Sequence, residues 1–343
     1  MGTWNFRRSV PLSLFILASL AIFMLGRNHL EHAAGLILPM LMRMKPLFLG
    51  IVLEALPFLL IGVMVSAIVQ VFVSEDTLRR LLPKNPVAAI AAACVLCILF
   101  PLCECGIVPI VRRLLAKGMP LYIGLVFLLV GPIVNPVVFA ATSTAFHLDP
   151  GIAWTRMGLG LFAGCGIAAV VLVMGIGSPL KFSRAQLQGV SPRESERASD
   201  PTPRMGQKLS QAVTHAGHET FEMGFYLLLG CFVAALLQAS IPAAAFAGIG
   251  DRLLPSSLLM MGLAYVLSLC STSDAFVAAS FAGLLPKGSL LGFLVLGPML
   301  DFKGTLMLLS VFRGRFVLLL SGLVVLFVLA GVLLVEHGAA IFR

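Results

Sequence analysis

Acidic side chains inside long apolar stretches are the residues of this sequence most able to do chemistry. There are five of them: Glu54, Glu104, Glu222, Asp274 and Asp301. An acidic side chain at the centre of a membrane helix costs about 2.5–3.5 kcal/mol on insertion scales, so such residues usually mark a substrate pathway or a proton relay. These residues therefore favour a proton-coupled carrier. For Glu54 and Glu222, a buried hydrogen bond that locks two parts of the chain together is an equally good interpretation.

Three of the five acidic residues coincide with sequences that break helices. Four such breaks occur, namely Pro101-Leu102-Cys103-Glu104-Cys105-Gly106, Gly131-Pro132-Ile133-Val134-Asn135, Cys270-Ser271-Thr272-Ser273-Asp274 and Gly297-Pro298-Met299-Leu300-Asp301. Proline removes a backbone donor, and glycine permits non-helical conformations. Freed backbone groups at membrane depth are tolerated only inside protein or beside a water-filled cavity. We therefore expect the four breaks to line a central pathway.

The residues predicted to line this pathway come from the breaks themselves. They are Cys103, Glu104, Cys105, Asn135, Cys270, Ser271, Thr272, Ser273, Asp274 and Asp301. Glu54, Glu222 and Lys303 are predicted to support or couple the pathway, and Lys303 is close enough in sequence to Asp301 to pair with it. The thiols of Cys103 and Cys105 suit a soft metalloid substrate if an unwound backbone lets them converge. No cysteine spacing predicts a structural metal or a disulfide framework.

The composition indicates a membrane protein. Of 343 residues, 59% are hydrophobic and 11% are charged, whereas a soluble domain has about 25% charged residues. The net charge of +9 comes from basic residues between apolar runs, a pattern that sets membrane topology and does not suit a nucleic-acid partner. The sequence has no phosphate-loop motif, and the H-E-x-x-H spacing of metalloproteases fails because Glu222 stands where the second histidine should be. We therefore expect no enzymatic activity and no cofactor.

The apolar stretches predict an all-α, multi-pass membrane protein with roughly eight or nine transmembrane helices. Residues 1–45 are predicted to form an N-terminal helix and connector, 46–176 a first transmembrane repeat, 177–215 a polar linker and 216–343 a second repeat. The linker is rich in Ser, Pro and charged residues and could not form a core. Its basic residues place it in the cytoplasm.

The two halves on either side of the linker carry matching motifs. In chain order the pairs are Glu54 and Gly62 with Glu222 and Gly230, Cys103-Glu104-Cys105 with Cys270-Ser271-Thr272, Lys117-Gly118 with Lys287-Gly288, and the second break with the fourth. Four matches in one order indicate an internal duplication. Many transporters are built from two such repeats, with the substrate site where the halves meet. Parallel and inverted repeats are both compatible with the sequence.

At these motifs the chain resembles a bacterial predicted-permease family that includes YraQ and the ArsP organoarsenical efflux permeases. The resemblance covers about residues 54–309 and is carried by residues 103–109, 131–136, 270–276 and 297–301. It implies an inner-membrane permease and, for ArsP-like members, efflux of trivalent organoarsenicals with paired cysteines at the metalloid. Between Cys103 and Cys105 this chain has Glu, as in the YraQ-like branch. ArsP-like members tend to have a small polar residue at this position. The resemblance therefore supports a permease better than any particular cargo.

Together these observations predict a secondary transporter of the inner (plasma) membrane, with proton-coupled efflux of a small solute such as a trivalent organoarsenical. Glu104, Asp274 and Asp301, with Asn135, would line its central site, and one or more carboxylates would carry the proton. A passive channel and a non-transporting membrane scaffold subunit are the alternatives. The expected partners are the lipid bilayer and a small-molecule or metalloid substrate, and a homo-oligomer is left open.

Overall fold

The computed structural model describes residues 34–72, 85–99, 103–176, 179–181, 205–240 and 253–341, together with Pro83. Within these residues the chain is helical apart from short connections, and two isolated β-bridges are the only β-structure. The all-α prediction is therefore confirmed for the part of the chain that the structure describes. The helix predicted near residues 10–25 lies outside it.

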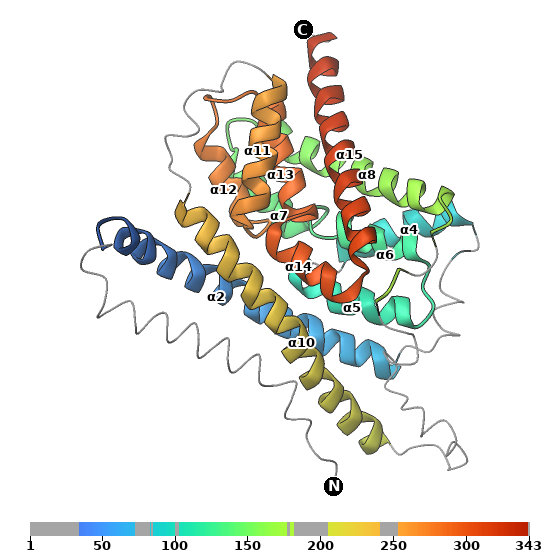
Figure 1. Cartoon of the computed structure of the whole chain (residues 1–343). Coiled ribbons are helices and arrows are strands. Elements are labelled where there is room, and N and C mark those ends of the chain that lie inside the picture. Colours follow the sequence, from blue (N-terminus) through green and yellow to red (C-terminus); the bar gives the residue numbers. More distant parts are fainter. Residues whose placement is uncertain are drawn as a thin grey trace.

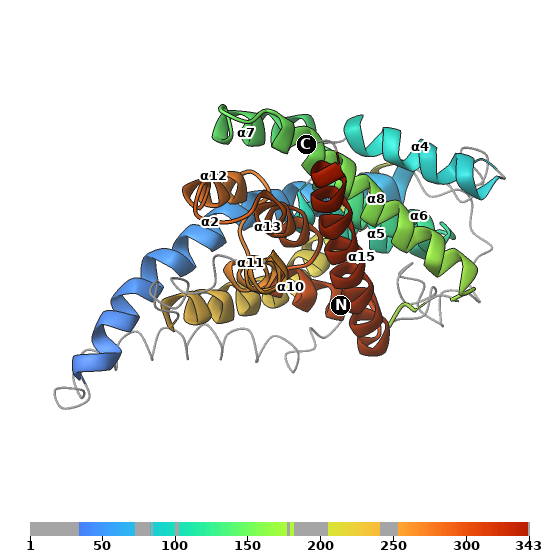
Figure 2. The same ribbon diagram turned by 90° about the horizontal axis from the view of Figure 1, so that it is seen from above.

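Long helices alternate with short ones along the described chain. They are α2 (Ala34–Phe72), α4 (Pro86–Leu99), α5 (Glu104–Ala116), α6 (Leu121–Val130), α7 (Pro136–Ala145), α8 (Gly151–Val173), α10 (Met205–Ser240), α11 (Leu253–Leu267), α12 (Ser273–Ser280), α13 (Lys287–Met299), α14 (Phe302–Val311) and α15 (Gly314–Ile341). The two longest, α2 and α10, pack against each other along one side of the molecule (Figure 1). Seen from above, α13 lies between α12 and α15 near the middle of the bundle (Figure 2), and all but its first residue are buried.

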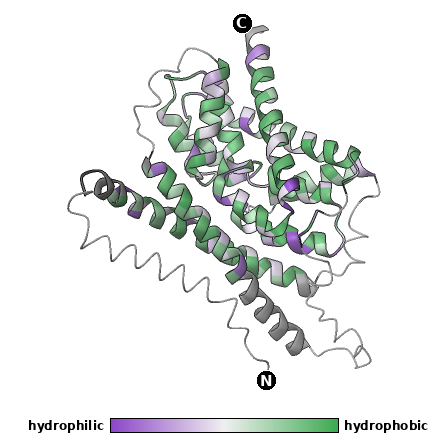
Figure 3. Ribbon diagram, viewed as in Figure 1, coloured by the Kyte–Doolittle hydropathy of each residue, from purple (hydrophilic) through white to green (hydrophobic). Residues whose placement is uncertain are grey.

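Several helical stretches have the length and composition of membrane spans. They are Leu41–Val69, Gly151–Val173, Thr220–Ala239, Lys287–Val311 and Gly314–His337. Hydrophobic residues cover most of the ribbon (Figure 3), and large apolar side chains such as Leu53, Val173 and Leu318 are exposed on its surface. An apolar exterior of this extent suits lipid and not water. The chain is therefore a multi-pass membrane protein.

The predicted breaks coincide with the ends of the short helices. A break separates α4 from α5, α6 from α7, α11 from α12 and α13 from α14. Asn135 caps α7, where its side chain accepts a hydrogen bond from Val137 N at 2.9 Å and Pro136 occupies the first turn. Asp301 caps α14 and accepts a hydrogen bond from Gly304 N at 2.7 Å. These side chains satisfy backbone donors that the new helices leave without partners.

Two helix boundaries differ from the prediction. Helix α2 begins at Ala34, within the stretch predicted as an N-terminal connector, and α10 begins at Met205, within the predicted linker of residues 177–215. Residues 205–215 contain strong helix formers and no proline, and they continue directly into the apolar stretch that follows. A polar segment can extend a membrane helix beyond the lipid, so polarity alone did not mark the start of this helix.

Candidate functional site

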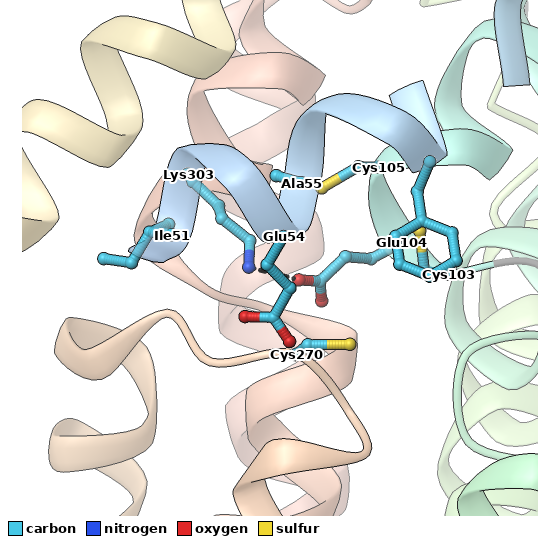
Figure 4. Close-up of a pocket in the computed structure, with 9 residues that line it drawn as sticks. Ile51, Glu54, Ala55, Cys103, Glu104, Cys105, Cys270 and Lys303 are labelled. Atoms are coloured by element: carbon cyan, nitrogen blue, oxygen red, sulfur yellow. Dashed lines mark ion pairs between the residues drawn. The ribbon is translucent and has the colours of Figure 1, made fainter. Parts of the chain in front are cut away.

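A small pocket lies where three of the four breaks approach one another. Its walls come from α2, the start of α5, the connection before α12 and the start of α14 (Figure 4). The residues that line it are Ile51, Glu54, Ala55, Phe58, Cys103, Glu104, Cys105, Cys270 and Lys303. The two parts of the chain on either side of residues 182–204 thus contribute to one site.

Lys303 is the charged centre of this site. Its side chain is 4% exposed, and its Nζ lies 2.8 Å from Glu104 Oε1 and 3.5 Å from Asp301 Oδ2. Nζ also donates a hydrogen bond to Ser268 O at 2.8 Å. The prediction that Lys303 pairs with Asp301 is confirmed, whereas its shorter ion pair with Glu104 was not predicted. Because two carboxylates face one ammonium, the fully ionised group has one net negative charge, which a single proton would neutralise.

The two carboxylates around Lys303 share this one ammonium. Lys303 Nζ faces both Glu104 Oε1 and Asp301 Oδ2, and no other described residue donates a hydrogen bond to either oxygen. Two buried carboxylates that share a single counter-ion are costly to keep ionised together in a low-dielectric environment. These two oxygens are therefore suitable places for a proton to bind.

Glu54 brings a third carboxylate to the pocket from α2. Its Oε1 accepts a hydrogen bond from Ser273 Oγ at 3.0 Å, which connects α2 to the first turn of α12. Figure 4 shows its carboxylate beside Cys270. Glu222, the matching residue of the second half, does not line the pocket and instead pairs with Arg112 Nη1 of α5 at 3.1 Å. Both residues thus connect the two halves, as the locking interpretation predicts, and Glu54 alone also lines the pocket.

Three thiols line the same pocket. Cys103 precedes α5 with an extended backbone (φ −77°, ψ 168°), so its side chain does not follow helical spacing to Cys105. Both thiols line the pocket, as is possible where the backbone is unwound. Cys270 lines the pocket from the other half. Within the described part of the chain, no three His, Cys, Asp or Glu side chains are grouped closely enough to hold a metal ion.

Two glycines allow backbones to meet beside the site. A Cβ added at Gly62 of α2 would collide with the backbone of Gly106, just after the Cys-Glu-Cys sequence. A Cβ added at Gly230 of α10 would lie 2.8 Å from Lys303 Cα. A side chain at position 62 would therefore push α5 and Glu104 away. A side chain at position 230 would push α14 and Lys303 away.

A second buried ion pair lies beside the pocket and was missed by sequence reasoning. Arg156 of α8 is 1% exposed. Its Nη2 lies 2.8 Å from Asp274 Oδ2 and donates to Ser271 O at 3.0 Å, while Nη1 donates to Thr142 Oγ1 at 2.8 Å. A cation inside the apolar stretch 152–176 was the signal that could have identified it, because such a residue needs a partner.

The remaining predicted residues do not line the pocket. They are Asn135, Ser271, Thr272, Ser273, Asp274 and Asp301. Ser273 and Asp301 contact pocket residues directly, and Thr272 Oγ1 is 3.5 Å from Cys270 Sγ. Asn135 serves as the cap of α7. The sequence predicted that the second break lines the pathway, but no residue of this break lines the pocket.

Comparison with known proteins gives consistent matches over most of the chain. A family described as "Predicted permease" (ArsP_1) matches residues 40–337. The UPF0718 protein YcgR of Bacillus subtilis (strain 168) is 43% identical over 295 residues, which cover 86% of this chain and 97% of the relative. A candidate "two-component membrane permease complex subunit" of Streptococcus mutans serotype c is 37% identical over 279 residues, which cover 80% of this chain and 89% of the relative. No solved structure matches.

Proposed function

The chain belongs to this predicted permease family, and we propose that it is a secondary transporter of the inner membrane that couples efflux of a small solute to proton movement. The observation that carries the proposal is the group formed by Glu104, Lys303 and Asp301, buried beside a pocket that both halves line. Ionisable residues buried within membrane segments commonly form ion and proton pathways.

Proton binding would act on the contact between the two halves. Protonation of Glu104 removes the charge that holds Lys303 at 2.8 Å and leaves Lys303 paired with Asp301 on its own helix. Since Glu104 belongs to α5 and Lys303 to α14, the contact between these helices then weakens. The halves can move relative to each other, so that the pocket opens alternately to the two sides of the membrane.

The lining of the pocket favours a soft, partly apolar solute. Cys103, Cys105 and Cys270 offer thiols, which bind soft metalloids well. Ile51 and Phe58 would add apolar surface for an organic substituent once the two halves move apart, because the pocket in this state is too small for such a solute. A trivalent organoarsenical has both properties and is the cargo that we propose to test first.

An internal duplication accounts for the arrangement of the helices. The order α2, α4–α5, α6–α7, α8 is followed by α10, α11–α12, α13–α14, α15. Gly62 and Gly230 occupy matching positions, and each meets a backbone beside the pocket. Asn135 and Asp301 match in the same way, and each caps the helix after its break. These correspondences support two repeats with the transport site between them.

The proposal is tested by transport in proteoliposomes that contain the purified protein and a trapped pH-sensitive dye. Methylarsenite is the cargo probe. We expect an imposed pH gradient to drive its protein-dependent flux and a methylarsenite gradient to move protons. Glu104→Gln should uncouple the two fluxes. Asp149→Asn is the matched control, because Asp149 also pairs with a lysine, Lys287, but at an exposed position.

The proposal is wrong if flux ignores the gradient and Glu104→Gln behaves as wild type. Fast, unsaturable flux would indicate a passive channel. Absence of any flux from the purified chain, with flux restored by a co-purifying membrane protein, would indicate a subunit of a larger permease. The subunit outcome is a specific alternative, because the name of the Streptococcus mutans relative describes one subunit of a two-component complex.

A further inference from the structure

Two buried cations donate hydrogen bonds to the connection between α11 and α12. Lys303 Nζ donates a hydrogen bond to Ser268 O at 2.8 Å, at the start of the connection. Arg156 Nη2 donates to Ser271 O at 3.0 Å, near its end. Cys270 lies between these two points and lines the pocket. The position of the Cys270 thiol therefore depends on both cations.

The backbone at Ser268 needs support from its surroundings. Its φ is +48°, and it is the one non-glycine residue of the described chain in the left-handed region. Ser268 is 1% exposed, and its Oγ accepts a hydrogen bond from Phe302 N at 3.2 Å. A serine is uncommon in this conformation, which persists where surrounding contacts determine it. The contacts of Ser268 with Lys303 and Phe302 therefore hold the connection in this conformation.

Arg156 is poorly explained as a structural ion pair alone. Its Nε and the Oδ1 of Asp274 have no hydrogen-bond partner among the described residues. Replacing a buried ion pair with apolar residues of similar volume is often neutral or stabilising, so stability alone is a weak explanation for such a pair. Its position does account for one thing: from α8, the guanidinium reaches Thr142 of α7, Ser271 of the connection and Asp274 of α12 at once.

We infer that Arg156 is a positioning residue of the transport site, which holds the connection between α11 and α12 so that Cys270 faces the pocket. Arg156 and Thr142 belong to the first half and Cys270 to the second. A shift of α7 and α8 relative to α12 would therefore move Cys270 in the pocket wall. The inference depends on the proposed function only in that the pocket is the transport site.

The test compares two pocket cysteines in the full chain. In one version Cys270 is the sole remaining cysteine, and in the other it is Cys103, which α5 positions without any contact to Arg156. Both are labelled in proteoliposomes with a membrane-impermeant maleimide. Arg156→Met combined with Asp274→Leu removes both charges together and so avoids leaving one of them alone in the protein interior. Removing the exposed pair, with Lys287→Met and Asp149→Leu, is the control.

We expect the Arg156 and Asp274 variant to change the labelling rate of Cys270 by about fivefold or more and to leave that of Cys103 unchanged. Unchanged rates at both cysteines, or equal changes at both, would overturn the inference. If this variant does not elute as a folded protein, Arg156→Lys replaces it. A lysine keeps the charge beside Asp274 but cannot hold Thr142, Ser271 and Asp274 together, so the same selective change is expected and its absence is again decisive. Labelling needs no cargo and no pH gradient, so its result is independent of whether proton coupling is found.

Discussion

Lys303 of α14 and Glu104 of α5 lie 2.8 Å apart, measured between Nζ and Oε1, and their side chains are 4% and 13% exposed. The contact joins the two halves of the chain at the pocket. In a membrane protein such a pair stabilises the fold only while both partners keep their charges, because the loss of one leaves the other uncompensated. The same contact can therefore hold the halves together in one protonation state and release them in another.

Removing Lys303 should be more harmful than removing Glu104. Lys303→Met leaves two carboxylates without their counter-ion, and we expect the free energy of unfolding to fall by about 3–5 kcal/mol. Glu104→Gln leaves Lys303 paired with Asp301 and should cost less. Adding Glu104→Gln to Lys303→Met should recover part of the loss, because one uncompensated charge disappears. Equilibrium unfolding in mixed detergent micelles measures all three variants, and simply additive losses would contradict the coupling.

Gly62 and Gly230 should be intolerant of alanine. A Cβ at either position meets a backbone at a distance that real Cβ atoms do not adopt. We expect Gly62→Ala and Gly230→Ala each to lower the free energy of unfolding by about 1–3 kcal/mol through forced separation of the helices. Gly50→Ala on α2 and Gly224→Ala on α10 are matched controls, since nothing lies within 4 Å of a Cβ there. The controls should be neutral or slightly stabilising, and thermal unfolding that ranks all four alike would refute the close approach.

The helix breaks were predictable from sequence because their causes are local. Proline, glycine and the capping side chains of Asn135 and Asp301 act within a few residues of their own positions. The Glu104–Lys303 contact was not predictable, because it depends on how α5 packs against α14. Arg156 could have been singled out as an intramembrane cation, but its three partners come from three separate segments. The early start of α10 was missed because a polar composition does not distinguish an extended helix from a linker.

The two roles of Asp301 should be separable. Its Oδ1 caps α14 through Gly304 N, and its Oδ2 faces Lys303 Nζ. Asp301→Asn keeps an acceptor for the cap, as Asn135 does at the start of α7, but removes the charge. We expect this variant to fold and to show altered proton coupling in proteoliposomes. Asp301→Ala also loses the cap and should be less stable than Asp301→Asn by about 0.5–2 kcal/mol. Equal stability of the two variants would show that the cap contributes little.

Glu54 and Glu222 should respond differently to the same substitution, although they match in sequence. Glu54 lines the pocket, and a glutamine there can still accept the hydrogen bond from Ser273. We therefore expect Glu54→Gln to leave thermal stability nearly unchanged and to alter methylarsenite transport, because the charge of the pocket changes. Glu222 pairs with Arg112 outside the pocket, and the two side chains are 30% and 8% exposed. Glu222→Gln should therefore lower the free energy of unfolding by about 1–2 kcal/mol, because Arg112 loses a counter-ion, and it should transport normally. Measuring transport and unfolding on both variants distinguishes a pathway residue from a lock between the halves. If both variants transport like wild type, Glu54 is also only a lock, and the chemistry of the pocket rests on Glu104, Lys303 and the thiols.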